Sequence, residues 1–263
     1  MRRAADLAQR AEQAGLNASA PPQEKLIEGW LIRLSPGKAK RSRCINALAA
    51  GSLPLDELLA RCQAAFAAAH LPLYVRVTPY SQPSDLDEQL AAKGWPASDA
   101  ADVMVLPALP ATAELPAGQV LQALEAPAYA QLVGHLRASS AEEISAHAER
   151  LQASPVPYRG FALRAADTSL LACGQFAREG GIVGLFDIFT PPEQRGQGCA
   201  LNLCRQLLQI AGSEGAHEAY LQVGSDNFEA QRVYARLGFS FAYRYHYRSP
   251  ATATTTATAN TAA

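Results

Sequence analysis

The stretch TPPEQRGQGCALNLCRQLLQIA, residues 190–211, decides how the second half of this chain is expected to fold. A turn-forming Pro-Pro pair opens it, a loop with two glycines follows, and a helix with one apolar stripe ends it. The stripe consists of Leu201, Cys204, Leu207, Leu208 and Ala211. Because the first N–H groups of a helix have no partner within it, a short loop at a helix start can bind an anion. The stretch therefore predicts that backbone groups hold a phosphate-bearing ligand.

The composition is typical of a globular chain. Its 263 residues correspond to one large or two small domains at roughly 150 residues each. A hydrophobic fraction of 49% can supply a core, and a net charge of −1 gives no argument for nucleic acid or an anionic membrane as partner. No segment approaches the roughly 18 apolar residues of a membrane span. The odd number of cysteines, without a C-x-x-C pair or a secretory signal, favours a reducing compartment, so we expect a cytoplasmic protein.

The two halves of the chain show the same order of expected elements. In the second half we expect strands at 161–164, 170–178, 182–190, 219–223 and 241–247, with helices from 200 to about 213 and at 228–236. In the first half we expect strands at 25–34, 39–48, 73–77 and 102–106, with helices from 55 to about 69 and at 86–92. This order favours an internal duplication, and a chance repeat of α+β order is the alternative.

A proline-rich segment, 108–118, is the best candidate for a linker between the halves. The expected domains are therefore 1–107 and 119–247. Residues 248–263 form a low-complexity tail that cannot pack a core, so we expect it to be disordered.

Two motifs in the second half resemble those of one enzyme family. Residues 195–200, RGQGCA, fit the pattern Q/R-x-x-G-x-G/A, and residues 227–239 fit N-x-x-A-x-x-x-Y-x-x-L-G-F. With these elements in this order, residues 119 to about 247 resemble the GCN5-related N-acetyltransferase (GNAT) family. The first half resembles the family only in element order and lacks the loop motif, so the chain is similar to a tandem member with a degenerate N-terminal half.

The resemblance implies an α+β fold and an acyltransferase activity. Each half would be a mixed, mainly antiparallel twisted sheet flanked by helices, with acetyl-CoA bound where strands 182–190 and 219–223 part. The implied reaction is direct transfer of acetyl from acetyl-CoA, as co-substrate, to a primary amine of an unidentified small molecule or protein. The alternative is a non-catalytic acyl-CoA-binding or regulatory module. The five histidines show no ligand spacing, so we expect no metal.

The resemblance places the cofactor contacts at the loop and at the start of the following helix. Glycine lets the backbone approach a pyrophosphate closely, and Arg195 adds charge. The expected cofactor-binding residues are Thr190, Arg195, Gly196, Gln197, Gly198, Cys199, Ala200 and Asn227. The alternative for the two glycines is a tight strand-to-helix turn, and for Asn227 a helix-start residue. Cys199 is expected to be a small filler, because no paired base would activate it as a nucleophile.

The resemblance makes two residues the expected catalytic pair. Tyr234 is suited to protonating the departing thiolate, because a phenol with a pKa near 10 is protonated at pH 7 and a thiol titrates near about 8.5. Its alternative is a tyrosine that packs in the core. Asp187 interrupts an apolar strand and is the candidate general base, or else a structural residue bonded to neighbouring backbone. The pair Glu142 and Glu143 follows serines in an S-x-x-E pattern, which predicts a helix capping box rather than catalysis.

Overall fold

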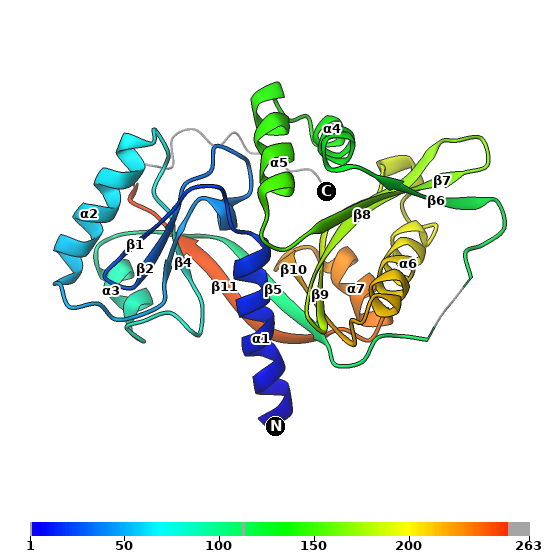
Figure 1. Cartoon of the computed structure of the whole chain (residues 1–263). Helices are drawn as coiled ribbons and strands as arrows, with labels where there is room; N and C mark the ends of the chain where they lie inside the picture. Colours follow the sequence, from blue (N-terminus) through cyan, green and yellow to red (C-terminus); the bar gives the residue numbers. More distant parts are fainter. Residues whose placement is uncertain (1, 112–113, 252–263) are drawn as a thin grey trace. The chain divides into compact units, whose positions relative to one another are not determined.

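The computed structural model describes residues 2–111 and 114–251 (Figure 1). The first half contains α1 (Arg2–Ala18), β1 (Glu24–Ile27), β2 (Trp30–Arg33), β3 (Ile45–Ala47), α2 (Leu55–Ala68), β4 (Val75–Val77), α3 (Leu86–Ala92) and β5 (Ala97–Leu106). The second half contains β6 (Gln119–Leu124), α4 (Ala126–Leu136), α5 (Ala141–Ala153), β7 (Tyr158–Ala165), β8 (Leu170–Glu179), β9 (Ile182–Phe189), α6 (Cys199–Ser213), β10 (Glu218–Gly224), α7 (Phe228–Arg236) and β11 (Ser240–Arg248). Of the helices in these described ranges, none is both long and apolar enough to cross a membrane.

The strands form one mixed sheet with the order β1-β2-β3-β4-β11-β5-β10-β9-β8-β7-β6. The pair β3·β4 and the pair β9·β10 are parallel, whereas β1·β2, β2·β3, β4·β11, β6·β7, β7·β8 and β8·β9 are antiparallel. The expected α+β class is confirmed. The expectation of a separate sheet for each half is corrected, because the strands of both halves join in one order.

The chain divides into two compact units, which we describe separately. Unit 1 comprises Met1–Ser19, Val103–Val223 and Phe228–Ala242, and unit 2 comprises Ala20–Asp102, Gly224–Asn227 and the chain from residue 243 on. These units depart from the expected domains 1–107 and 119–247, which stay a proposal. The expected linker 108–118 includes residues 112–113, and most of the expected tail 248–263 lies beyond residue 251, outside the described residues.

The difference between units and expected domains arises at three elements. In unit 1, α1 is tied to β10 by two hydrogen bonds from Arg10 to the carboxylate of Glu218. Strand β5 begins in unit 2 and ends in unit 1, where it neighbours β10. Strand β11 begins in unit 1 and ends in unit 2, where it pairs with β4 through Tyr247↔Arg76. The last strand of each half therefore completes the sheet of the other half's unit, which sequence periodicity alone does not reveal.

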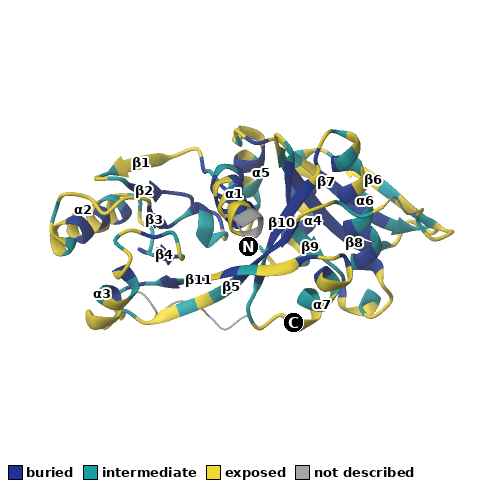
Figure 2. Cartoon of the chain, turned by 90° about the horizontal axis from the view of Figure 1, so that it is seen from below, coloured by how far each residue is buried: buried dark blue, intermediate teal, exposed yellow. Residues whose placement is uncertain are grey.

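The core of unit 1 lies on both faces of its sheet. On one face, the apolar stripe of α6 packs against β8 and β9, and the predicted stripe residues are all buried. On the other face, α4 and α5 pack around Tyr129 and Cys173. Figure 2 shows this part of the sheet as largely buried, as expected for strands covered on both faces.

The expected elements match the observed ones more closely in unit 1 than in unit 2. Helix α7 has its expected bounds, and Gly238 ends it with a φ of 94°. The expected strand 25–34 is instead the hairpin β1–β2, because Glu28 and Gly29 both adopt positive φ and make a tight turn. Helix α4 was not expected, whereas the capping box that opens α5 at Ser140 is confirmed.

Candidate active site

Strands β9 and β10 part within unit 1, as expected for the cofactor site. Their parallel pairing runs from Ile182↔Glu218 to Leu185↔Leu221, although β9 continues to residue 189. Beyond that point the two strands no longer share a ladder, so their backbone groups face the space between them.

A β-bulge lies on β9 just past this point. On β8, Gln175 pairs with Phe186 and Cys173 pairs with Phe189, so two residues of β9 face one residue of β8. One of these two is Asp187, with a φ of 51°. A bulge re-aims side chains at a strand end, and here it turns Asp187 toward the face of the sheet that α4 and α5 cover.

Two glycines with positive φ form the loop that precedes α6. Gly196 and Gly198 have φ values of 75° and 80°, and Gly198 is the N-cap residue. A Cβ atom added at either glycine would meet nothing within 4 Å, so the space above the loop is open. The first turn of α6 carries no acidic residue, which leaves its N–H groups and dipole available to a phosphate. The loop therefore fits the pyrophosphate of acetyl-CoA. The two glycines also form a tight strand-to-helix turn, which was the alternative interpretation of this motif.

Other residues of the expected cofactor site stabilise the loop from within. Arg195 Nε donates to the carbonyl of Thr190 at 3.4 Å, and Gln197 Nε2 donates to the carbonyl of Glu193 at 3.1 Å. Cys199 is buried, and burial raises the pKa of its thiol. A protonated, buried thiol is a poor nucleophile, which agrees with its expected role as a filler.

Asn227 belongs to the short segment of unit 2 that precedes α7. Its N–H donates to the carbonyl of Gly224 at 3.1 Å. This backbone bond closes a turn before α7 and is compatible with both expected roles of Asn227, the cofactor contact and the helix-start residue.

Tyr234 lies on α7 with only 8% of its surface exposed. Its ring meets Phe239 edge to face, with centroids 6.2 Å apart. Burial raises its pKa well above the ordinary value, so the hydroxyl is protonated at neutral pH. Within the described residues, the Tyr234 hydroxyl makes no hydrogen bond, and it is not one of the buried polar atoms that lack a partner.

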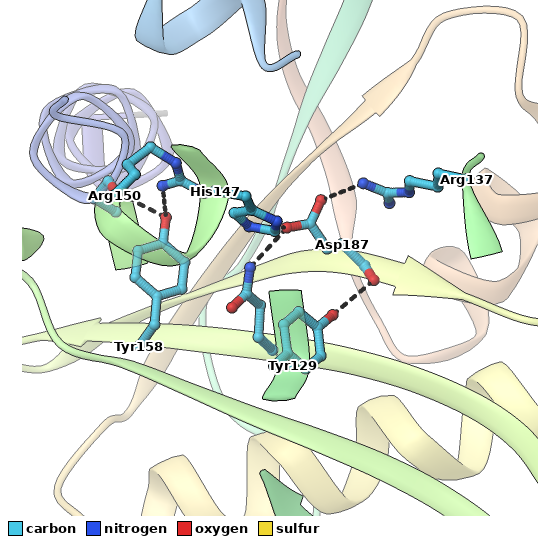
Figure 3. A network of polar contacts seen from close by, with 8 residues as sticks. Tyr129, Arg137, His147, Arg150, Tyr158 and Asp187 are labelled. Atoms are coloured by element: carbon cyan, nitrogen blue, oxygen red, sulfur yellow. Dashed lines mark hydrogen bonds and ion pairs between the residues drawn. The ribbon is translucent and has the colours of Figure 1, made fainter. Parts of the chain in front are cut away.

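Asp187 is the centre of a polar network in unit 1 (Figure 3). Its Oδ1 accepts from Arg137 Nη1 at 2.6 Å, and its Oδ2 accepts from Gln175 Nε2 at 2.6 Å. His147 Nε2 lies 3.5 Å from the same Oδ2, and the Asp187 carbonyl accepts from Tyr129 at 3.1 Å. The side chain is therefore bonded to side chains of other elements, not only to neighbouring backbone as its structural alternative supposed.

The contacts around Asp187 favour an ionised carboxylate next to the His147 imidazole. A guanidinium and an amide that bond to its two oxygens stabilise the ionised form of Asp187. In return, the charge of Asp187 raises the pKa of Arg137 above its ordinary value. An ionised carboxylate that faces one imidazole nitrogen orients the ring and stabilises its protonated form, which lets the other nitrogen accept a proton. The proton acceptor of this network is therefore His147, with Asp187 ionised behind it.

Sequence reasoning missed four residues of this network: Tyr129, Arg137, Gln175 and His147. They come from α4, the turn after it, β8 and α5, and only tertiary packing brings them together. The capping box at Ser140 was the available signal, because a helix that begins there places His147 on a defined face. No group of three or more His, Cys, Asp or Glu side chains in the described ranges could hold a metal ion.

Comparison with known proteins places the second half in a family. Residues 121–239 match the model of the acetyltransferase (GNAT) family. The chain is also 36% identical over 72 residues to the uncharacterized N-acetyltransferase YobR of Bacillus subtilis, a match that covers 27% of this chain and 29% of that protein. The chain thus spans less than a third of the length of that relative.

Solved structures share the fold over a longer part of the chain. A GCN5-related N-acetyltransferase from Kribbella flavida is similar with a TM-score of 0.69 at 20% identity, over 94% of this chain and 95% of that one. A tandem GNAT protein from the clavulanic acid biosynthesis pathway is similar with a TM-score of 0.57 at 18% identity, over 74% and 69%. At these identities the likeness concerns the fold, and it extends to the first half that the family model does not match.

Proposed function

We propose, since residues 121–239 belong to the acetyltransferase (GNAT) family, that the chain transfers acetyl from acetyl-CoA directly to a primary amine. The observation that carries the proposal is the open glycine loop at the start of α6, beside the point where β9 and β10 part. The proposed cofactor-binding residues are Thr190, Arg195, Gly196, Gln197, Gly198, Cys199, Ala200 and Asn227. The N–H groups of the α6 first turn would bind the pyrophosphate, and Arg195 would add positive charge.

The proposed chemistry follows from the groups at the parted strands. The amine nitrogen attacks the thioester carbonyl carbon, a C–N bond forms, and the C–S bond breaks. His147, held by Asp187, takes the proton that the amine loses, so Asp187 acts through the imidazole. Tyr234 donates a proton to the departing sulfur, which leaves as a free thiol. Solvent then restores the protonation of both residues.

A non-catalytic acyl-CoA-binding module is the second candidate. The burial of Tyr234 favours it, because a tyrosine with a raised pKa is a weaker acid than an ordinary phenol. Both candidates predict binding of coenzyme A, but only the enzyme predicts consumption of the thioester.

A thiol-release assay separates the two candidates. The full chain is incubated with acetyl-CoA and a panel of primary amines, and free thiol is followed against a sample without amine. We expect thiol release that depends on the amine and on enzyme concentration. Binding of coenzyme A by calorimetry without thiol release for any amine would favour the module.

A further inference from the structure

A second charged side chain on α5 bears on the chemical class of the acceptor. Arg150 lies three residues after His147, so the two side chains share one face of the helix. Figure 3 shows both side chains in one view, Arg150 beside Tyr158 and His147 beside Asp187, with Arg150 on the opposite side of His147 from Arg137. The face of α5 that presents the proposed proton acceptor therefore also presents a guanidinium.

The Arg150 side chain is buried, and among the described residues no carboxylate forms an ion pair with it. Only 5% of its surface is exposed. Its Nη1 donates to the Tyr158 hydroxyl at 3.4 Å, and its guanidinium carbon lies 5.3 Å from the Tyr158 ring centroid. The Tyr158 hydroxyl in turn donates to the carbonyl of Ala18 at 2.7 Å, at the C-terminal end of α1. A neutral hydroxyl and an aromatic face compensate a buried cation only in part.

Two other arginines of unit 1 show what is missing at Arg150. Arg137 is bonded to Asp187, and Arg159 is bonded to Glu214 on the surface. Each of these guanidiniums has a carboxylate partner, although both are more exposed than Arg150. Because a buried charge without a counter-ion is costly, a buried arginine beside a candidate active site is well placed to receive an anion from a ligand.

We infer, on the basis of the function proposed above, that the acceptor is an amino acid or a similar short amine that carries a carboxylate. Arg150 binds the carboxylate, and His147 with Asp187 receives the amine. A planar guanidinium can bind a carboxylate through two parallel hydrogen bonds, which sets the orientation of the acceptor. Residues three apart on a helix have Cβ atoms about 5–6 Å apart, so the amine and the carboxylate must lie close together in the acceptor.

The first test compares acceptors that differ only in this charge. The full chain with acetyl-CoA is assayed by thiol release with a set of free amino acids, each beside its carboxamide. The carboxamide has the less basic amine and more of it in the reactive neutral form, so it is the better acceptor unless the carboxylate is recognised. We expect kcat/KM to be higher for the acid by about tenfold or more, the size of a lost charge-assisted hydrogen-bond pair. Equal values, or a preference for the carboxamide, would overturn the inference.

The second test assigns that preference to Arg150. Arg150→Gln should raise KM for the acid by about tenfold or more and leave kcat/KM for the carboxamide within about threefold. Arg150→Lys keeps the charge and should keep part of the preference. Arg159→Gln is the matched control, because its guanidinium also lies over a ring, that of Phe161, but is exposed and paired with Glu214. An equal loss for acid and carboxamide in Arg150→Gln would mean that Arg150 only stabilises the fold.

A binding experiment separates failure of this inference from failure of the proposed function. The same acid and carboxamide are titrated by calorimetry into the chain loaded with coenzyme A. If no amine releases thiol but the acid binds more tightly and Arg150→Gln abolishes the difference, the enzyme proposal fails and the carboxylate site stands. If acid and carboxamide bind equally, the carboxylate site is wrong whether or not the chain is an enzyme. If Arg150→Gln does not fold, the inference is still tested by Arg150→Lys and by the ratio of kcat/KM for the acid to kcat/KM for the carboxamide in the parent chain.

Discussion

Two strand-to-helix connections of this chain occupy the same place in the order of elements and differ in what they can bind. The connection from β9 to α6 in unit 1 is open, exposes its glycines and has no acidic residue in the first helical turn. The connection from β3 to α2 in unit 2 is closed by the chain itself. Glu28 accepts hydrogen bonds from the N–H and the hydroxyl of Ser52, at 3.2 and 2.5 Å. Asp56 and Glu57 then occupy the first turn of α2.

This difference indicates that the loop sequence, not the order of elements, decides whether a helix start can accept an anion. The positive end of the α2 dipole is already compensated by two carboxylates, and a third lies beside the loop. A pyrophosphate there would meet negative charge, whereas at α6 it would meet N–H groups in a first turn that carries no acidic residue. We therefore expect one coenzyme A per chain, with its pyrophosphate at the start of α6 in unit 1.

The largest expected effect comes from a residue that has no chemical counterpart in unit 2. Tyr234 stands four residues before Gly238, and the residue four before Gly94 is the fully buried Leu90. Tyr234→Phe keeps the ring in its packing and removes the hydroxyl. We expect kcat to fall by about 10²- to 10⁴-fold, the usual cost of a lost general acid, with little change in acetyl-CoA affinity. Turnover within about threefold of the parent, under about 1 kcal/mol of barrier, would show that Tyr234 only packs the core.

The next effect concerns the open loop itself. Gly198→Asp places a side chain and a negative charge in the open space at the α6 start. We expect the Kd for acetyl-CoA, measured by calorimetry, to rise at least about tenfold, which is about 1.4 kcal/mol. Gly180→Asp is the matched control in unit 1, since Gly180 also has a positive φ and open space around it. If both variants fold and bind acetyl-CoA equally well, the loop does not hold the pyrophosphate.

The two connections also mark where sequence reasoning works and where it stops. The stripe of α6, the bounds of α7 and the turn at Gly238 follow from local periodicity and cap chemistry, and all are observed. The network at Asp187 could not be predicted, because His147 and Arg137 reach it only through packing of helices on a bulged strand. A bulge and its partners depend on register between strands, which one sequence does not display.

The pairing of β5 and β11, the last strands of the two halves, could not be predicted for a related reason. The periodicity of β5 and β11 identifies both as strands but does not say which neighbour each will pair with. Each pairs beyond its own half, with β5 beside β10 and β11 beside β4. A boundary drawn at a proline-rich segment therefore could not reproduce the compact units.

The corresponding Gly-to-Asp substitution in the β3–α2 connection of unit 2 tests whether that connection binds the cofactor. Gly51 has a φ of 76°, and a Cβ atom there would lie 3.2 Å from the carbonyl oxygen of Glu28. Gly51→Asp should therefore lower the free energy of unfolding by about 1–2 kcal/mol through backbone strain, without changing the Kd or the stoichiometry for acetyl-CoA. Urea unfolding and calorimetry of the same sample measure both. A second coenzyme A site in the parent that this variant removes would show that unit 2 also binds the cofactor.

The smallest expected effect is the loss of unfolding free energy at low pH that Glu28 causes at the β3–α2 connection. The hydrogen bonds from Ser52 lower the pKa of Glu28 below its ordinary value of 4.5. A carboxyl whose pKa is lower in the folded state stabilises the fold above its unfolded pKa, and this contribution is lost as the pH falls through the folded pKa. Between about pH 5 and about pH 3, the parent should therefore lose slightly more free energy of unfolding than Glu28→Gln. Urea unfolding followed by tryptophan fluorescence measures this in unit 2, because both tryptophans, Trp30 and Trp95, lie there.

Unit 1 offers a matched control for this last experiment. Asp167 accepts hydrogen bonds from the N–H and the hydroxyl of Ser169, which lower its pKa in the same way. If the tryptophan signal reports unit 2 alone, Asp167→Asn should leave its acid dependence unchanged while Glu28→Gln flattens it. An equal flattening by both variants would mean that the two units unfold as one. No flattening by Glu28→Gln would mean that the bond to Ser52 does not close the unit 2 loop in solution.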